Sequence, residues 1–98
     1  SRLNLSKKPI DFGPAVTDGA FRLELSPKQT IVTPLPDSPT FSITLKLERL
    51  PQFARRPPKK IIAVDPRGKE LRKVKFRRDG KTIAFETRQG EFAYKILE

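Results

Sequence analysis

Apolar and polar residues alternate with a period of two through much of this chain. The clearest run covers residues 40–48, where every second residue is apolar: Phe41, Ile43, Leu45 and Leu47. Residues 20–26 alternate in the same way, residues 29–33 can form a short strand, and residues 61–64 are a short apolar segment. Because this period is typical of a strand with one buried face, we predict strands over all four segments. Residues 1–19 are expected to be irregular with strand fragments at 2–5 and 10–12, interrupted by turn signals at Gly13-Pro14 and Asp18-Gly19.

The last third of the chain, residues 60–97, carries the strongest hairpin signal. Asp79-Gly80 favours a two-residue turn, since glycine readily adopts the positive φ that such turns require. With Arg78 opposite Lys81, the predicted cross-strand pairs are Phe76–Ile83, Val74–Phe85, Arg77–Thr82, Lys75–Ala84 and Lys73–Glu86. This register places the apolar side chains on one face and nearly all polar ones on the other. Leu71 is out of phase with this face, which predicts a β-bulge near Arg72.

A second turn signal, Gln89-Gly90, assigns the same apolar residues to the inward face. With Arg88 opposite Glu91, the predicted neighbours are Thr87–Phe92, Phe85–Tyr94 and Ile83–Ile96. The two turns together predict a continuous antiparallel meander with Phe85 at its centre, packed against Phe41, Ile43, Leu45 and Leu47 from a second sheet.

Proline-rich segments separate these strands. Residues 34–39 hold three prolines, and residues 50–60 form a predicted crossing loop that ends in adjacent prolines and basic residues. The chain shows no internal repeat, heptad or credible amphipathic helix. We therefore predict one all-β domain over residues 1–98, an antiparallel β-sandwich (immunoglobulin-like or similar) of about seven to nine short strands. An open barrel is the alternative.

The composition argues against most catalytic chemistry. The chain has no Cys and no His, so it lacks thiolate ligands and the commonest general base and metal ligand. Its aspartates lie mainly in predicted turns, where a carboxylate hydrogen-bonds the backbone, and several glutamates lie on outer strand faces. We expect a non-catalytic domain with no cofactor and no metal ion. The sequence has neither a signal peptide nor an apolar run of membrane-spanning length, so we expect no membrane partner.

Positive charge is concentrated in the second half of the chain. The net charge is +10, and residues 50–98 hold fourteen Lys and Arg against six acidic residues. Two candidate sites for a polyanion follow: the crossing-loop patch of Arg55, Arg56, Lys59 and Lys60, and the basic ridge of Lys73, Lys75 and Arg77, with Arg78 at the turn. Alternate side chains on a strand are about 6.5–7 Å apart, close to a phosphate or sulfate repeat. Against the ridge, the predicted Lys73–Glu86 pair would neutralise part of it.

Aromatic residues offer little for ligand stacking. The chain has no Trp and a single Tyr, which the predicted register points inward. Most Phe side chains fall on predicted core faces, with Phe53 in the crossing loop as the candidate for exposure. This counts against a neutral-glycan platform. It also weakens single-strand nucleic acid recognition, because no aromatic is interleaved with the basic residues.

Several segments together match a known pattern: VTDGAFRL (16–23), TPLP (33–36), FSITLKL (41–47), IAVD (62–65), GKEL (68–71), FET (85–87) and GEFAY (90–94). The pattern resembles the small β-sandwich modules that close large multidomain glycoside hydrolases, whose final strand resembles "faYki". The resemblance implies a non-catalytic accessory domain packed against the catalytic domain of a parent chain, with no catalytic residue carried over. A secreted parent would place it outside the cell or in the periplasm.

Two functional hypotheses follow. The first is an accessory, structural module of a larger carbohydrate-active enzyme; the absence of Met from the chain agrees with a fragment or module of a larger protein. The second is a binding module for an acidic polymer, either an anionic polysaccharide or, with weaker support, nucleic acid. It rests on the basic residues of the crossing-loop patch, the basic ridge and Arg78.

Overall fold

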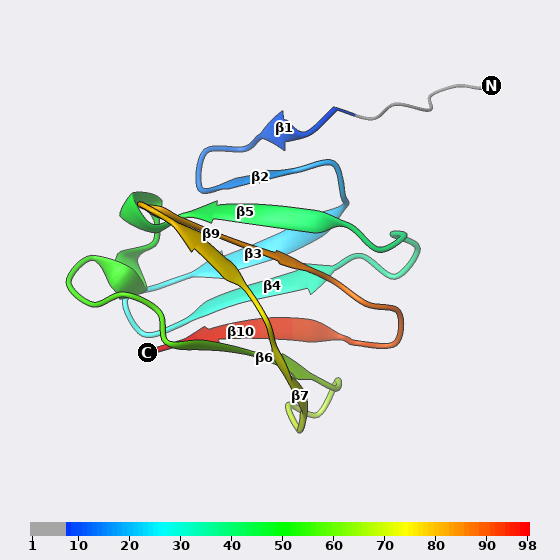
Figure 1. Ribbon diagram of the computed structural model, residues 1–98. Coiled ribbons are helices and arrows are strands. Elements are labelled where there is room, and N and C mark those ends of the chain that lie inside the picture. The colour runs from blue at the N-terminus through cyan, green and yellow to red at the C-terminus, as the bar shows by residue number, and fades with distance from the viewer. Residues whose placement is uncertain (1–7) are drawn as a thin grey trace.

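The chain forms a sandwich of two five-stranded antiparallel sheets (Figure 1). The computed structural model describes residues 8–98. The first sheet has the order β1 (Ile10–Asp11), β2 (Ala15–Thr17), β5 (Ser42–Lys46), β9 (Thr82–Glu86) and β8 (Arg77–Asp79). The second has the order β3 (Phe21–Leu25), β4 (Thr30–Pro34), β10 (Ala93–Leu97), β6 (Lys60–Val64) and β7 (Glu70–Val74). Two short 3₁₀ turns, η1 (Leu47–Arg49) and η2 (Pro51–Phe53), follow β5.

The predicted all-β sandwich is confirmed, with more strands than expected. The four strands predicted from alternation are present as β3, β4, β5 and β6. Ten strands form within residues 8–98, against seven to nine expected. The excess arises because β2 forms between the two early turn signals and because the strand predicted before Asp79 is divided into β7 and β8. The alternating segment 2–5 lies outside the described residues.

The predicted bulge near Arg72 is also confirmed. Ala63 of β6 lies opposite Arg72 of β7, whereas the next residue, Val64, lies opposite Glu70. Leu71 is therefore the extra residue, and its side chain is exposed. A bulge of this kind changes the facing of a strand at one point, as the phase change in the sequence indicated.

The predicted register at Asp79-Gly80 is wrong by two residues. Asp79 pairs with Thr82, so the two turn residues are Gly80 and Lys81, and Arg78 pairs with Ile83 rather than facing Lys81. Gly80 has a φ of 61°, the left-handed conformation that glycine tolerates best. A shift of two residues keeps every side chain on its predicted face, because facing repeats with the same period.

The predicted continuous meander is wrong in its connections. After β7 in the second sheet, the chain crosses to β8 in the first sheet, and β9 and β10 also lie in different sheets (Figure 1). Val74 therefore pairs with Ile61, and Phe85 pairs with Ile43 in its own sheet. Phe85 and Tyr94 still touch, but across the core, with ring centroids 5.3 Å apart.

The predicted inward facing is largely confirmed despite these changes. One buried cluster contains Ile43, Leu45, Ile83, Phe85 and Tyr94, and the partly buried Phe76 packs against it. Two aromatic residues depart from prediction. Phe53 is buried, whereas Phe92, predicted to face inward beside Thr87, is 46% exposed.

Candidate polyanion-binding site

A basic groove of about 740 Å³ lies where the chain crosses from β7 to β8. Five cationic side chains and one carboxylate line it: Arg72, Lys73, Lys75, Arg77, Arg88 and Glu86. Buried or partly buried residues, including Val74, Phe76 and Phe85, supply an apolar floor. The basic ridge predicted from the sequence therefore forms part of the lining of this groove.

Along the segment from β7 to β8, side chains point alternately toward solvent and toward the core, and this alternation positions the ridge. Lys73 lies on β7 opposite Ile62, and Arg77 lies on β8 opposite Ala84. Lys75 belongs to the two-residue link between these strands. The intervening residues Val74 and Phe76 turn toward the core, so all three ridge side chains are exposed.

The ridge charges are not neutralised by neighbouring carboxylates. The predicted Lys73–Glu86 pair is wrong, because Glu86 lies opposite Ser42 of β5. The ion pairs within residues 8–98 join Lys46 to Asp11, Arg72 to Glu91 and Lys81 to Glu48. Within residues 8–98, the ridge side chains and Arg88 therefore form no ion pair, and their positive charges are available to bind an anion.

Arg72 differs from the other cations because a partly buried cluster of hydrogen-bonded side chains holds it. Its guanidinium donates two hydrogen bonds to Glu91, from Nε to Oε2 and from Nη2 to Oε1 at 2.9 Å. The Tyr94 hydroxyl donates to Glu91 Oε1 at 2.6 Å and accepts the backbone N–H of Arg88 at 2.8 Å. This cluster fixes the start of the loop after β9 and so positions Arg88 at the edge of the groove.

The cluster also shifts the pKa values of its members. Burial alone would raise the pKa of Glu91, but the hydrogen bonds from Arg72 and Tyr94 outweigh it and lower that pKa below its usual value. Burial raises the pKa of Tyr94, and its hydrogen bond to Glu91 raises it further. Glu91 therefore stays ionised and Tyr94 stays protonated at neutral pH.

We expect the domain to lose stability at alkaline pH, where Tyr94 ionises on unfolding. An unfolded tyrosine ionises near pH 10, whereas Tyr94 in the folded protein has a raised pKa and resists ionisation. The hydroxyl of Tyr94 therefore makes its full contribution to the free energy of unfolding below about pH 10, and this contribution is lost as the pH rises further. Urea denaturation across this range should show stability falling in the native protein. In Tyr94→Phe the fall should be smaller. Because Tyr94 is the one tyrosine in the chain, tyrosinate absorbance reports it directly, and ionisation near pH 10 without unfolding would contradict this prediction.

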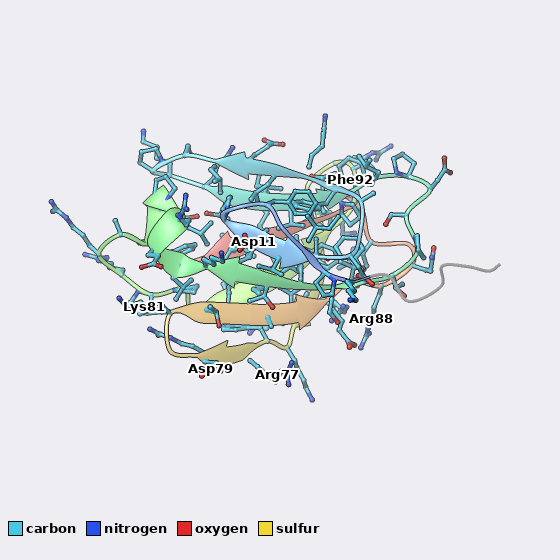
Figure 2. All side chains as sticks on the ribbon, turned by 90° about the horizontal axis from the view of Figure 1, so that it is seen from above. Asp11, Arg77, Asp79, Lys81, Arg88 and Phe92 are labelled. Carbon is cyan, nitrogen blue, oxygen red and sulfur yellow. The ribbon has the colours of Figure 1, made fainter. Side chains whose placement is uncertain are left out.

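The other predicted basic residues lie outside the groove. Arg78 faces the turn, where its Nε donates to the carbonyl of Gly80 at 3.2 Å. The crossing-loop patch is exposed at the left end of the sandwich in Figure 1, where the Lys59 N–H donates to the carbonyl of Leu97 near the C-terminus. The crossing-loop patch and the ridge are therefore two separate basic patches on the surface. Figure 2 shows Arg88 toward the right of the molecule, Arg77 near the middle of its lower edge and Lys81 toward the left.

Sequence reasoning did not assign Arg72 or Arg88 to the site. Arg88 was assigned to a turn, and no periodicity indicates which way a turn residue points.

Over residues 8–98, no cluster of acidic side chains could hold a metal ion. None of the helical turns described is long and apolar enough to cross a bilayer. Comparison of the chain with family models, curated proteins and solved structures finds no match.

Proposed function

We propose that this domain is a non-catalytic module that binds an anionic polymer along the basic groove. The observation that carries the proposal is the grouping of Lys73, Lys75, Arg77 and Arg88 around one groove, without carboxylate partners among the described residues. Glu86 is the one acidic side chain in the lining, so positive charge is in excess. A polymer with an anionic group at each repeat would release counterions when it neutralises these cations.

Binding of this kind should depend steeply on salt. Four phosphate or sulfate contacts predict a slope of about −3 for log Kobs against log salt concentration. The net charge of +10 would add a weaker, longer-range attraction that also decreases with ionic strength. The salt slope therefore estimates how many cations of the groove take part.

A charge-matched pair of triple variants tests the site. Lys73→Ala, Lys75→Ala and Arg77→Ala together remove three positive charges from the groove. The control, Arg55→Ala, Arg56→Ala and Lys59→Ala, removes three from the crossing-loop patch. On heparin or an oligonucleotide we expect the groove variant to bind on the order of tenfold more weakly, with a shallower salt slope, and the control to change little.

Two results would overturn the proposal. Equal losses in both triple variants would show that net charge, rather than the groove, causes retention. Failure of the native protein to bind any anionic polymer at low salt would exclude the function itself.

We propose as a second candidate that the domain is an accessory module of a larger glycan-processing enzyme. The observation that favours it is apolar exposure around β1, where Ile10 is 57% exposed and Phe12 is 49% exposed. Exposed apolar side chains of this kind are suited to a contact with a neighbouring domain. A catalytic domain in the same open reading frame would support this proposal, and a complete gene with no such domain would exclude it.

A further inference from the structure

A second groove, here called the proline groove, lies between the loop from β4 to β5 and the loop from β9 to β10. It has a volume of about 440 Å³, and its lining includes Pro34, Leu35, Pro36, Pro39, Arg22 and Phe92. Phe92 and Leu35 are both exposed large apolar side chains. The groove therefore offers an aromatic ring to solvent in a chain whose other aromatic side chains mainly fill the core.

Arg88 connects the two grooves because it lines both of them. In Figure 2, Arg88 lies between Arg77 and Phe92, toward one end of the molecule. Arg88 is held there by the hydrogen bond from its backbone N–H to Tyr94 and by the turn at Gln89-Gly90, where Gly90 has a φ of 85°. A ligand in the basic groove can thus continue past Arg88 to the ring of Phe92.

The charges of the proline groove match an anionic ligand as well. Arg22 and Arg88 line it, and its acidic residue, Glu91, is already bound by Arg72 and Tyr94. An anion therefore meets positive charge along both grooves, and Phe92 adds a flat apolar surface at one end.

We propose that the preferred ligand is a single-stranded nucleic acid, with phosphates in the basic groove and a base stacked on Phe92. This inference rests on the proposed anion-binding function and adds the ligand class. A single strand combines a repeating anionic backbone with unpaired flat bases, which stack on aromatic side chains. A duplex hides those faces within its own stack, and a sulfated polysaccharide has no aromatic face.

Three probes and one matched control variant test the inference. The probes are an oligothymidylate, a DNA duplex of equal length and heparin. Phe92→Ala should weaken oligothymidylate binding roughly 5- to 150-fold, the loss expected for one stacked base. Binding of duplex and heparin should stay within about twofold, because neither stacks on the ring. Phe12→Ala removes a ring of similar exposure that lines neither groove, and it should leave all three affinities unchanged.

Phe92→Trp separates stacking from local damage to the loop. A larger flat ring should retain or tighten oligothymidylate binding, whereas a damaged loop would weaken it. Equal loss on all three probes in Phe92→Ala, or no loss on any, would overturn the inference and leave polyanion binding by the basic groove intact. Tighter binding of heparin than of oligothymidylate at equal salt would assign the groove to an acidic polysaccharide instead. If no probe binds the native protein, the proposed function itself fails.

Discussion

Replacing Phe85 with alanine is expected to lower the free energy of unfolding by about 3–5 kcal/mol. The Phe85 side chain is 4% exposed, and it packs beside Ile43 in its own sheet and against Tyr94 from the other. The cavity left by alanine would be lined by strands of both sheets, which can relax only in part. Since a small domain has roughly 5–15 kcal/mol of stability in total, this variant would be near the limit of folding.

Two further variants distinguish a packing effect from other causes. Lys75→Ala removes an exposed side chain close by and should change stability by no more than about 0.5 kcal/mol. Phe85→Leu keeps most of the volume and should cost clearly less than Phe85→Ala. Urea denaturation followed by circular dichroism measures all three. A damaging Lys75→Ala together with a mild Phe85→Ala would mean that the facing of this segment is inverted.

The strands from Val74 to Tyr94 show what alternation can and cannot predict. A period of two correctly assigned Val74, Ile83, Phe85 and Tyr94 to the core. It did not show which strands are neighbours, because the inner faces of both sheets meet in one core. A meander within one sheet and a chain that crosses between sheets therefore give the same pattern. The partner of a strand depends on the path of its connections, which alternation does not encode.

Alternation likewise predicted one part of the candidate site and not the other. The basic ridge was predicted because Lys73, Lys75 and Arg77 alternate with apolar residues along one extended segment. Phe92 was wrongly predicted to face inward, and Arg88 was assigned only to a turn, because both lie in the loop between β9 and β10, where no period sets the facing. The predicted Lys73–Glu86 pair depended on a register that does not form. The ion pair of Arg72 on β7 with Glu91 in that loop neutralises Arg72. It was not predicted, because no pattern in the sequence indicates it.

Replacing Gly19 with alanine is expected to lower the free energy of unfolding by about 3 kcal/mol. The sequence assigned Gly19 to a turn with Asp18, but its φ is not positive, so backbone conformation is not the reason for glycine here. A Cβ at this position would lie 2.1 Å from Cγ of Phe41 and 2.2 Å from Cδ2, distances that the ring cannot accommodate without moving. At an unstrained site with free space, the same substitution would stabilise the protein by about 0.4–1 kcal/mol through the unfolded state.

Phe41 has little freedom to move away from the new methyl group. Its backbone N–H donates to Thr87 Oγ1 at 3.0 Å, and its carbonyl accepts the Thr87 N–H at 2.9 Å. A double-mutant cycle isolates the clash, because Phe41→Ala removes the ring that the added methyl group would meet. Gly19→Ala should then cost much less in the Phe41→Ala background than in the native one, with a coupling free energy of more than about 1 kcal/mol. Additive costs in the cycle would show that Gly19 is needed for a reason other than contact with this ring.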